Sequence, residues 1–523
     1  MSYKIGIDVG GTNTDAVILD NHNNLLGGIK TPTTKDIGTG IFNAIEEVLR
    51  QANVEASKVE YTMLGTTACT NALVERKNLS RVGMVRISLP AASSITPMYT
   101  WPQDLRETVG ELCFEIHGGY EYDGSLISED LNEYEINEVI RSFKAEGVEA
   151  VAISGVFSPV RADQEKYLAE RLRAALGTEV PITMSHEIGS IGLLERENSA
   201  GLNAALVKVA SLAAGGLEKA LQERGMNPRI FFAQNDGTLM DLEYVRKFPV
   251  LTIGSGPTNS IRGAAFLSGL RDCLVVDVGG TTTDVGVLSN GFPRTSGIAV
   301  EIGGVRTNFR MPDILAVGLG GGSVVRVENG DVEIGPDSVG YRLVEKAIGF
   351  GGDTLTTTDV IARTDSGRIN HPAYNVERLI HIPETVVSRV NDRIRKTIEA
   401  SIDRMKTSDK DLPTVLVGGG GILIPDKLAG TSEIIRPPHY QYANAIGAAI
   451  AQVSGEVDRM WSLEKSTRHQ AVEEAKETAI RMAMNAGAES DSISIVDFEE
   501  VPLAYLSSSA LRIRAKAAGT LRN

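Results

Sequence analysis

Apolar and polar residues alternate at the start of the chain, and the same arrangement returns near its middle. Every second residue from Tyr3 to Val9 is apolar, and an apolar run follows at 16–19. Apolar runs at 274–276 and 285–288 frame a second segment in the same way. Because paired glycines separate the two runs in both segments, the pattern predicts two β-hairpins with tight turns.

The two turns carry nearly the same sequence. Asp-Val-Gly-Gly-Thr-Asn-Thr-Asp stands at 8–15 and Asp-Val-Gly-Gly-Thr-Thr-Thr-Asp at 277–284, and seven of the eight positions are identical. The copies begin 269 residues apart, which is far too long for a solenoid repeat. The repetition therefore predicts two large lobes that each open with the same hairpin.

The chemistry of these turns is that of an anion site. Two adjacent glycines permit φ > 0 and bring backbone N–H groups close to a ligand, and the threonine hydroxyls add neutral donors. Asp8 and Asp277 end the two first strands and would place a carboxylate beside bound phosphates, where Mg²⁺ resolves the repulsion. The pair predicts a nucleotide site with a hard divalent cation.

Further segments fit around such a nucleotide. Four glycines at 418–421 follow a buried-strand pattern at 414–417, which suits the adenosine end of a nucleotide, although a flexible turn has the same composition. Small residues dominate 443–451 and 254–265. We expect both segments to be helices that pack closely and slide at a junction between lobes.

The C-terminal segment carries the pattern of a helix and two strands. Apolar residues recur with helical spacing from 469 to 486, and Gly487 follows. Residues 493–498 and 511–515 read as strands. Together with the hairpins, these patterns predict three units, an N-terminal lobe at 1–180, a second lobe at 181–453 and a C-terminal subdomain at 454–523.

Composition and charge narrow the class of protein. Hydrophobic residues make up 42% and charged residues 23% of the chain, as in an ordinary globular protein. The net charge of −15 repels a phosphate backbone, so we expect no nucleic-acid partner. No apolar run approaches the roughly 20 residues of a membrane helix, and the first residues lack a signal-peptide pattern. We therefore expect no membrane association and a cytoplasmic location.

The cysteines indicate neither a covalent nor a metal framework. Cys69, Cys113 and Cys273 lie far apart and form no ligand spacing, so neither disulfides nor a structural zinc site is predicted. No histidine lies near Cys69 in the sequence, so an inert buried thiol is favoured there over a nucleophile.

The two hairpins and seven further segments, in a fixed order, resemble one family. The seven are GTTACTNALVER at 65–76, SHEIGSIGLLERENSAGLNA at 185–204, GSGP at 254–257, GLGGGS at 318–323, IGPDSVG at 334–340, TTTD at 356–359 and GGGG at 418–421. The set resembles the actin-like ATPase superfamily and, within it, a short form of the ATP-binding A-type subunit of the hydantoinase/oxoprolinase family. The resemblance covers roughly residues 3–453.

One five-residue segment and one single position depart from the family pattern. The family commonly has a Thr-Thr-x-Gly-Phe-Arg-Asp element where this chain reads Val-Arg-Ile-Ser-Leu at 85–89. Asn198 stands where a Ser or Thr is common.

The resemblance implies an α/β, two-lobed, actin-like (ribonuclease H-like) ATPase fold with duplicated phosphate-binding hairpins and an interlobe cleft. It implies ATP and Mg²⁺ as cofactors, and the ATP-dependent opening of a cyclic amide or imide such as a hydantoin, 5-oxoproline or another lactam. An ATP-dependent ketone carboxylase subunit stays open as an alternative, as do a small-molecule kinase and a non-catalytic ATP-driven switch. Many A-type members work with a separate B-type subunit, so we expect that partner or a homo-oligomer.

The predicted site residues fall into three groups. Asp8, Asp277 and Asp284 are the predicted catalytic residues, and Asp8 and Asp277 are also the predicted metal ligands. The predicted nucleotide ligands are Gly10, Gly11, Thr12, Asn13, Thr14, Gly279, Gly280, Thr281, Thr282, Thr283, Gly320, Gly321, Gly418, Gly419 and Gly420. The predicted substrate residues are Thr66, Thr67, Asn71, His186, Glu195, Arg196 and Asn235.

Structural interpretations stay open for the substrate group. Thr66 or Thr67 could cap a helix, and His186 could be a satisfied turn residue instead of a metal ligand or an acid–base partner of Glu187.

The remaining assignments have similar alternatives. Glu195 and Arg196 are adjacent and cannot share a helix face, and a structural salt bridge would also explain them. Residues 235–237 also read locally as a turn. The segment 320–323 and Asp359 are expected near the second hairpin.

Overall fold

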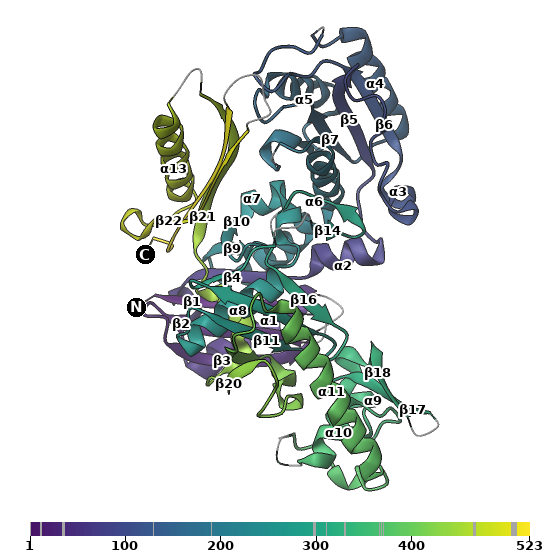
Figure 1. The fold of residues 1–523 in the computed structure, drawn as a ribbon, viewed down its shortest axis with the longest axis vertical. Coiled ribbons are helices and arrows are strands. Elements are labelled where there is room, and N and C mark those ends of the chain that lie inside the picture. The colour runs from purple at the N-terminus through teal and green to yellow at the C-terminus, as the bar shows by residue number, and fades with distance from the viewer. Residues whose placement is uncertain are drawn as a thin grey trace.

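Two β-sheets, each containing one of the repeated hairpins, form the framework of the chain (Figure 1). The first sheet has the strand order β22-β23-β21-β10-β9-β4-β1-β2-β3, and the second has the order β13-β12-β11-β19-β20 with β16 paired to β12. The structure is a computed structural model that describes residues 2–10, 13–33, 37–128, 130–189, 191–296, 300–309, 311–328, 331–365, 367, 369, 371–463, 467–503 and 510–522.

Both predicted hairpins are confirmed. In each, the two strands pair antiparallel, and the first strand also pairs parallel with a later strand, β4 in one sheet and β19 in the other. The strands of the first sheet are β1 Tyr3–Val9, β2 Asn13–Asp20, β3 Leu25–Pro32, β4 Val59–Thr66, β9 Arg229–Ala233, β10 Leu239–Asp241, β21 Val453–Ser462, β22 Ser494–Pro502 and β23 Ala510–Gly519. Those of the second are β11 Cys273–Val278, β12 Thr283–Ser289, β13 Phe292–Pro293, β16 Ile314–Val317, β19 Leu412–Val417 and β20 Thr431–Ile435.

A separate parallel sheet forms the upper part of the molecule in Figure 1 and carries helices α4 and α5. Its elements are α3 Gln103–Val109, β5 Val82–Leu89, β6 Leu112–His117, α4 Glu133–Glu146, β7 Ala150–Gly155, α5 Asp163–Leu176 and β8 Ile182–Met184. The long helix α6, Leu193–Gln222, packs on this sheet and on α1, Ile37–Ala52, of the first sheet. It therefore ties the two regions together.

Helix α6 is the one described helix whose length and composition would allow it to cross a membrane. About 61% of its most apolar window is buried inside the protein. Its first half also buries charged and polar side chains, among them Arg196, Glu197 and Asn203. These features are those of a core helix that links two packed regions.

The lower part of Figure 1 is an extension of the second sheet. Helix α11, Glu384–Met405, buries Val390, Ile394, Ile398 and Ile402, which recur every fourth residue and form one apolar stripe. The other elements of this region are β17 Ser323–Glu328, β18 Asp331–Ser338, α9 Leu343–Lys346 and α10 Thr357–Thr364. The short hairpin of β14 Glu301–Ile302 and β15 Val305–Arg306 lies instead beside α6, where Ile302 and Val305 join its hydrophobic core (Figure 1).

The C-terminal helix and strands are confirmed, and they extend the first sheet. Helix α13, Arg468–Asn485, packs on β21 and β23 and buries an alanine at nearly every fourth position. Strand β21 pairs with β10 and thereby joins this segment to the sheet of the first hairpin. The limits 1–180, 181–453 and 454–523 stay a prediction, since the first sheet takes strands from all three ranges.

Helices α8, Ser255–Ser268, and α12, Ala443–Ala449, cross in backbone contact between the two sheets. A Cβ atom on Gly447 would overlap the backbone of Asn259, and one on Gly263 would overlap the backbone of Ala443. The two glycines are therefore required by the closeness of the crossing. The predicted pair of small-residue helices is confirmed.

We expect Gly447→Ala to lower the free energy of unfolding by at least about 2 kcal/mol, because a methyl group there forces the two helices apart. Gly216→Ala is the matched control. Gly216 lies in α6 with no atom near its missing Cβ, so the same change should raise stability by about 0.5–1 kcal/mol. Thermal and urea unfolding of both variants measure the difference, and equal stability of the two would contradict the close crossing.

Candidate active site

Two pairs of aspartates face each other across the repeated hairpins. Asp8 on β1 lies opposite Asp15 on β2, and Asp277 on β11 lies opposite Asp284 on β12. The same turn bond closes both hairpins, since the N–H of Gly10 donates to the Asn13 carbonyl at 3.0 Å and that of Gly279 to the Thr282 carbonyl at 2.8 Å. The duplication predicted from sequence thus extends to the hydrogen-bond pattern of the turns.

Burial and mutual repulsion make these carboxylates hard to ionise. Burial, with a smaller contribution from the charge of Asp15, raises the pKa of Asp8 to about 7. Burial and then the charge of Asp277 raise the pKa of Asp284 to about 7, and burial also raises the pKa of Asp277 and of Asp15. Carboxylates in this state are stabilised by any cation that enters between them.

Lys30 on β3 supplies a cation that the sequence motifs did not indicate. Its ammonium nitrogen lies 2.5 and 2.6 Å from the two carboxylate oxygens of Asp15. Its Cε atom lies 3.8 Å from the point where Gly419 would carry a Cβ. Lys30 therefore reaches from the first sheet to the glycine run of the second lobe, where it can contact an anion held between them.

The crossing helices hold the first aspartate of each hairpin. The Ser260 hydroxyl of α8 donates to Asp277 at 2.7 Å, and the Asn444 amide of α12 lies 3.4 Å from Asp8 as a donor. Neither residue was among the predicted site residues, because only the helix crossing brings them there.

Glycines give both carboxylates room. A Cβ on Gly65 of β4 would lie 2.7 Å from an oxygen of Asp8, and one on Gly418 would clash with an oxygen of Asp277. Gly418 also has φ +82°, a conformation that favours glycine. Gly65 lies opposite Asp8 in the strand register, and Gly418 lies one residue after Val417, which is opposite Asp277.

The predicted nucleotide residues of the second lobe surround its hairpin. The N–H groups of Gly321 and Gly322 donate to the carbonyls of Gly279 and Gly280 at 3.0 and 2.7 Å. Gly420 lies against the Gly279 carbonyl. Gly11 and Thr12 of the first hairpin lie outside the described residues. A nucleotide-binding role for all these positions stays a prediction.

A cavity of about 350 Å³ lies next to the glycine run. Side chains of α10, α11 and the segment after the glycines line it, among them Ile361, Thr364, Asn391, Arg395, Leu423 and Pro425. Helix α10 begins beside the second hairpin, where the Thr357 hydroxyl donates to the Gly321 carbonyl at 2.9 Å. At about 1.5 Å per residue, the cavity lies roughly 10 Å along α10 from that hairpin.

Thr66, Thr67 and Asn71 lie at the start of α2, Ala68–Glu75, beside the first hairpin. The Thr67 hydroxyl donates to the Val9 carbonyl at 3.3 Å, and Asn71 donates to the Thr67 hydroxyl at 3.3 Å. Thr66 accepts from the Ala68 N–H at 3.2 Å, a local bond at the helix start. The segment thus combines a structural role with a position next to the candidate site.

His186 and Arg196 make internal contacts in the upper part of the molecule. His186 Nδ1 lies 2.5 Å from Glu165, so its partner is Glu165 and not the adjacent Glu187. The buried Arg196 donates to the Ser185 hydroxyl at 2.9 Å and to the Ile191 carbonyl at 2.8 Å.

These contacts and the nearby charge of Arg196 hold the pKa of Glu165 below its usual value, although burial alone would raise it. Glu195 lies 3.3 Å from Arg306 and 29% of its side chain is exposed. The contacts favour a structural role for this motif, and its role toward substrate stays a prediction.

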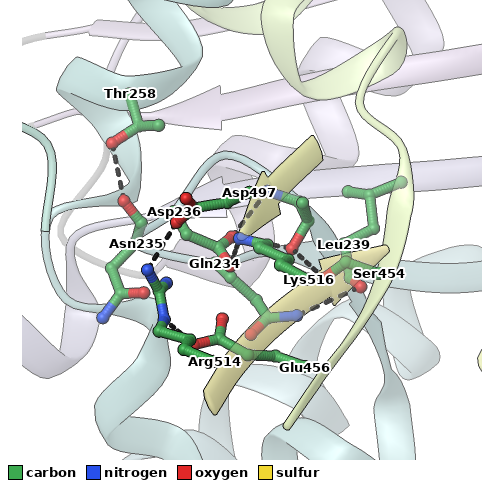
Figure 2. A network of polar contacts seen from close by, with 11 residues as sticks. Gln234, Asn235, Asp236, Leu239, Thr258, Ser454, Glu456, Asp497, Arg514 and Lys516 are labelled. Carbon is green, nitrogen blue, oxygen red and sulfur yellow. Dashed lines mark hydrogen bonds and ion pairs between the residues drawn. The ribbon is translucent and has the colours of Figure 1, made fainter. Parts of the chain in front are cut away.

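Asn235 is buried at the turn between β9 and β10, at one side of a polar network. Its carbonyl accepts from the Thr258 hydroxyl of α8 at 2.9 Å (Figure 2). The next residue, Asp236, forms an ion pair with Lys516 of β23, and Glu456 pairs with Arg514 at 2.6 Å. Asn235 Nδ2 has no hydrogen-bond partner in the described part of the chain.

The thiol and metal expectations have separate outcomes. Burial raises the pKa of Cys69 to about 11, so the thiol is inert as expected.

Among the described residues, no group of three or more His, Cys, Asp and Glu side chains could hold a metal ion.

Comparison with known proteins shows which family the chain resembles. The family model of the hydantoinase/oxoprolinase N-terminal region matches residues 4–176, and the hydantoinase/oxoprolinase family model matches residues 196–377. The caprolactamase subunit alpha of Pseudomonas jessenii is 27% identical over 68% of this chain and 53% of its own length. The acetophenone carboxylase gamma subunit of Aromatoleum aromaticum is 27% identical over 71% of this chain and 54% of its own length. The chain thus spans about half the length of each of these two relatives.

A solved structure extends the likeness to the fold. The crystal structure of the ATP-dependent caprolactamase from Pseudomonas jessenii superimposes with a TM-score of 0.77 at 20% identity, covering 99% of this chain and 88% of the other. The α/β fold class that the family resemblance implied is confirmed. The chain belongs to the hydantoinase/oxoprolinase family.

Proposed function

We propose that this chain binds Mg-ATP between its two hairpins and uses the γ-phosphoryl group to activate the carbonyl oxygen of a cyclic amide or imide, which water then opens. The observation that carries the proposal is the pair of duplicated glycine turns, which bring buried Asp8 and half-buried Asp277 close enough for the charge of Asp277 to raise the pKa of Asp8. Caprolactamase and 5-oxoprolinase relatives, whose names denote action on cyclic amides, support this substrate class.

The turn glycines, Lys30 and the cavity beside α10 fit the parts of a nucleotide. The N–H groups at 10–14 and 279–283 would hold the phosphates, and Lys30 would add a positive charge on the first-lobe side. The cavity lined by Ile361 and Leu423 would take the adenosine, since it lies about 10 Å from the second turn along α10.

The residues present fit a divalent cation. Asp8 and Asp277 are carboxylates whose pKa burial has raised, and Asp277 also adds to the rise at Asp8. Mg²⁺ is commonly bound by one or two carboxylates together with substrate phosphates and waters. Bound there, it would supply positive charge to the transferring phosphoryl group.

The reaction follows from the weakness of an amide as an electrophile. The amide oxygen attacks the γ-phosphorus, the bond from that phosphorus to ADP breaks, and ADP keeps the electron pair. Water then adds to the activated carbon and the ring C–N bond breaks, with the nitrogen taking the electron pair and a proton. Hydrolysis of the resulting acyl phosphate releases phosphate. The protein mainly positions the groups and stabilises charge.

A second candidate function is the activation of a ketone or bicarbonate in a carboxylase. The acetophenone carboxylase gamma subunit and the acetone carboxylase beta subunit match this chain over 71% and 68% of its length. Because these relatives and the caprolactamase are named as subunits, we also propose that the chain assembles with a further subunit.

The experiment that separates the candidates is ADP release from Mg-ATP with hydantoins, 5-oxoproline, larger lactams and small ketones, each with and without bicarbonate. Stimulation by a ring, with ring-opened product and free phosphate, supports the proposal. Stimulation by a ketone only in the presence of bicarbonate supports the carboxylase. A stable phosphorylated product would mark a kinase and contradict both.

We expect Asp8→Asn to fold normally and to lose at least about 100-fold in ATP turnover, because the amide cannot neutralise a cation beside the phosphates. Asp409→Asn, at an exposed loop position, is the control and should retain full activity. Steady-state ADP release and circular dichroism check both variants. Near-normal turnover by Asp8→Asn would rule out its role at the phosphates.

The adjacent residues Glu195 and Arg196 give a further test. We expect Arg196→Met to destabilise the protein by about 3 kcal/mol or more, because it leaves buried Glu165 with less positive charge nearby. Glu195→Gln should change stability by less than about 1 kcal/mol, since its ion pair is partly exposed. Urea unfolding measures both changes. If the Arg196→Met protein is as stable as the unmodified chain but loses ATP turnover, the structural role is wrong and Arg196 takes part in the reaction.

A further inference from the structure

The cavity beside the glycine run has walls of two kinds. One wall is apolar and rigid, because Ile361 and Leu423 are only 6% and 2% exposed and belong to the hydrophobic core of the second lobe. The other wall is the side of α11 that carries Asn391 and Arg395. The volume of about 350 Å³ lies within the range of ligand pockets, which is about 300–1,000 Å³. The cavity therefore has room for the base of a nucleotide.

Two carboxylates of the same helix hold the guanidinium group of Arg395 by its edge. Its Nη2 atom donates to Asp392, one turn earlier, at 2.5 Å, and its Nη1 atom donates to Glu399, one turn later, at 3.2 Å. Hydrogen bonds from a guanidinium group lie in its plane, so these bonds leave its two faces open. Because Arg395 lines the cavity and 42% of its side chain is exposed, a planar ring in the cavity can stack on one face.

The neutral polar side chains of the cavity are already engaged within the protein. The Thr364 hydroxyl donates to the Val360 carbonyl at 3.1 Å, and the Asn391 amide nitrogen donates to the same hydroxyl at 3.0 Å. The amide oxygen of Asn391 has no partner among the described residues, but it is enclosed in the wall and has almost no accessible surface. Neither side chain is therefore placed to read the edge of a base.

The charged side chains of the cavity suit both purines. Asp365 and Asp392 can accept a hydrogen bond from the amino group of adenine, and equally from the N1–H or amino group of guanine. Arg395 can donate to N7, an acceptor that the two purines share. The described side chains thus provide no pattern of donors and acceptors that only adenine matches.

We propose that this cavity binds the base by its faces, with Arg395 on one side of the ring and the apolar wall on the other, and that it therefore accepts guanine as well as adenine. The inference rests on the proposed function, in which the hairpins hold the phosphates and the metal. GTP then serves as a phosphoryl donor. The amide oxygen attacks its γ-phosphorus, the bond from that phosphorus to GDP breaks, and GDP keeps the electron pair.

Stacking predicts an order of affinities among the bases. Every base has a π face, so stacking on a side chain tolerates a change of base. Adenine and guanine offer two fused rings of similar outline, whereas a pyrimidine offers one ring and covers less of the walls. Affinity should therefore differ little between the purines and fall for the pyrimidines.

Calorimetric titration with Mg²⁺ and nucleoside diphosphates tests this order without any lactam. GDP should bind within about 5-fold of ADP, and CDP should bind at least about 10-fold more weakly than either. A preference for ADP over GDP of about 100-fold or more would mean that hydrogen bonds read the edge of the base, and it would overturn the inference.

Arg395→Ala tests the stacking contact. Asp392 keeps Lys396 as a partner at 2.7 Å. Glu399 keeps the N–H of Ala429 at 3.0 Å, so the fold should be maintained. The variant should bind ADP and GDP about 10-fold more weakly, by the same factor for both, because each loses the same guanidinium face. Its affinity for inorganic tripolyphosphate should be unchanged.

Arg393→Ala is the matched control. Arg393 is exposed and lies two residues away on α11, so it points to the other side of the helix. Its loss should leave the binding of ADP and GDP unchanged. Equal losses in the two variants would indicate a general effect of charge and contradict stacking, as would unchanged binding by Arg395→Ala.

The outcomes distinguish this inference from the function on which it rests. If a lactam stimulates turnover, GTP should support it within about 10-fold of ATP, and a failure of bound GTP to do so overturns the donor role. If no lactam stimulates turnover, the proposed reaction fails, whereas the affinities for ADP and GDP still decide how the base is bound. If neither diphosphate binds, the proposed function and the inference fail together.

Discussion

The backbone contact between α8 and α12 sets the geometry of the candidate site. Gly263 and Gly447 carry no side chain where the helices cross, so each helix contacts the main chain of the other at these points. The same helices pack on the hairpin sheets, α12 against Gly6 of β1 and α8 against Gly286 of β12. One crossing thus fixes the separation and orientation of both hairpins, and with them the aspartates that Ser260 and Asn444 hold. A change of a few tenths of an ångström there would move both halves of the site together.

The site concentrates negative charge that the fold alone does not neutralise. Four hairpin carboxylates lie close enough to raise one another's pKa values or to be raised by burial, and among them only Asp15 has a direct cationic partner, Lys30, within the described residues. Other buried charges have partners of opposite charge, as Arg86 and Glu197 do at 2.6 Å. Uncompensated charge confined to one place is typical of a site that becomes stable only with its ligands bound.

Local sequence patterns predicted the helices, strands and turns, whereas tertiary packing determined which further residues lie at the candidate site. The hairpins, the glycine run after β19 and the helix at 468–485 follow from alternation, helical spacing and glycine positions within short windows, and all three appear in the structure. Lys30, Asn259 and Ser260 carry no local signal, because they reach the site only when β3 pairs with β2 and α8 crosses α12. The polar residues of 185–204 stood out in the sequence for a related reason. A buried helix that contains charged side chains must supply a partner for each, which produces a motif as distinctive as a catalytic one.

The two halves of the site are alike in backbone but different in what they leave unpaired. Around Asp277, the Ser260 hydroxyl, the glycine run and the segment 320–322 fill the space with bonds to the hairpin. Around Asp8, the Asn444 bond is long at 3.4 Å, and Asn259 offers an amide that pairs with nothing described in the chain. A braced hairpin suits a group that must be held still through the reaction, such as the nucleotide phosphates. The repeat therefore fixes the turn itself, because the same N–H to carbonyl bond closes both hairpins. The helices and glycine segments packed on each turn decide which polar groups that half leaves unpaired.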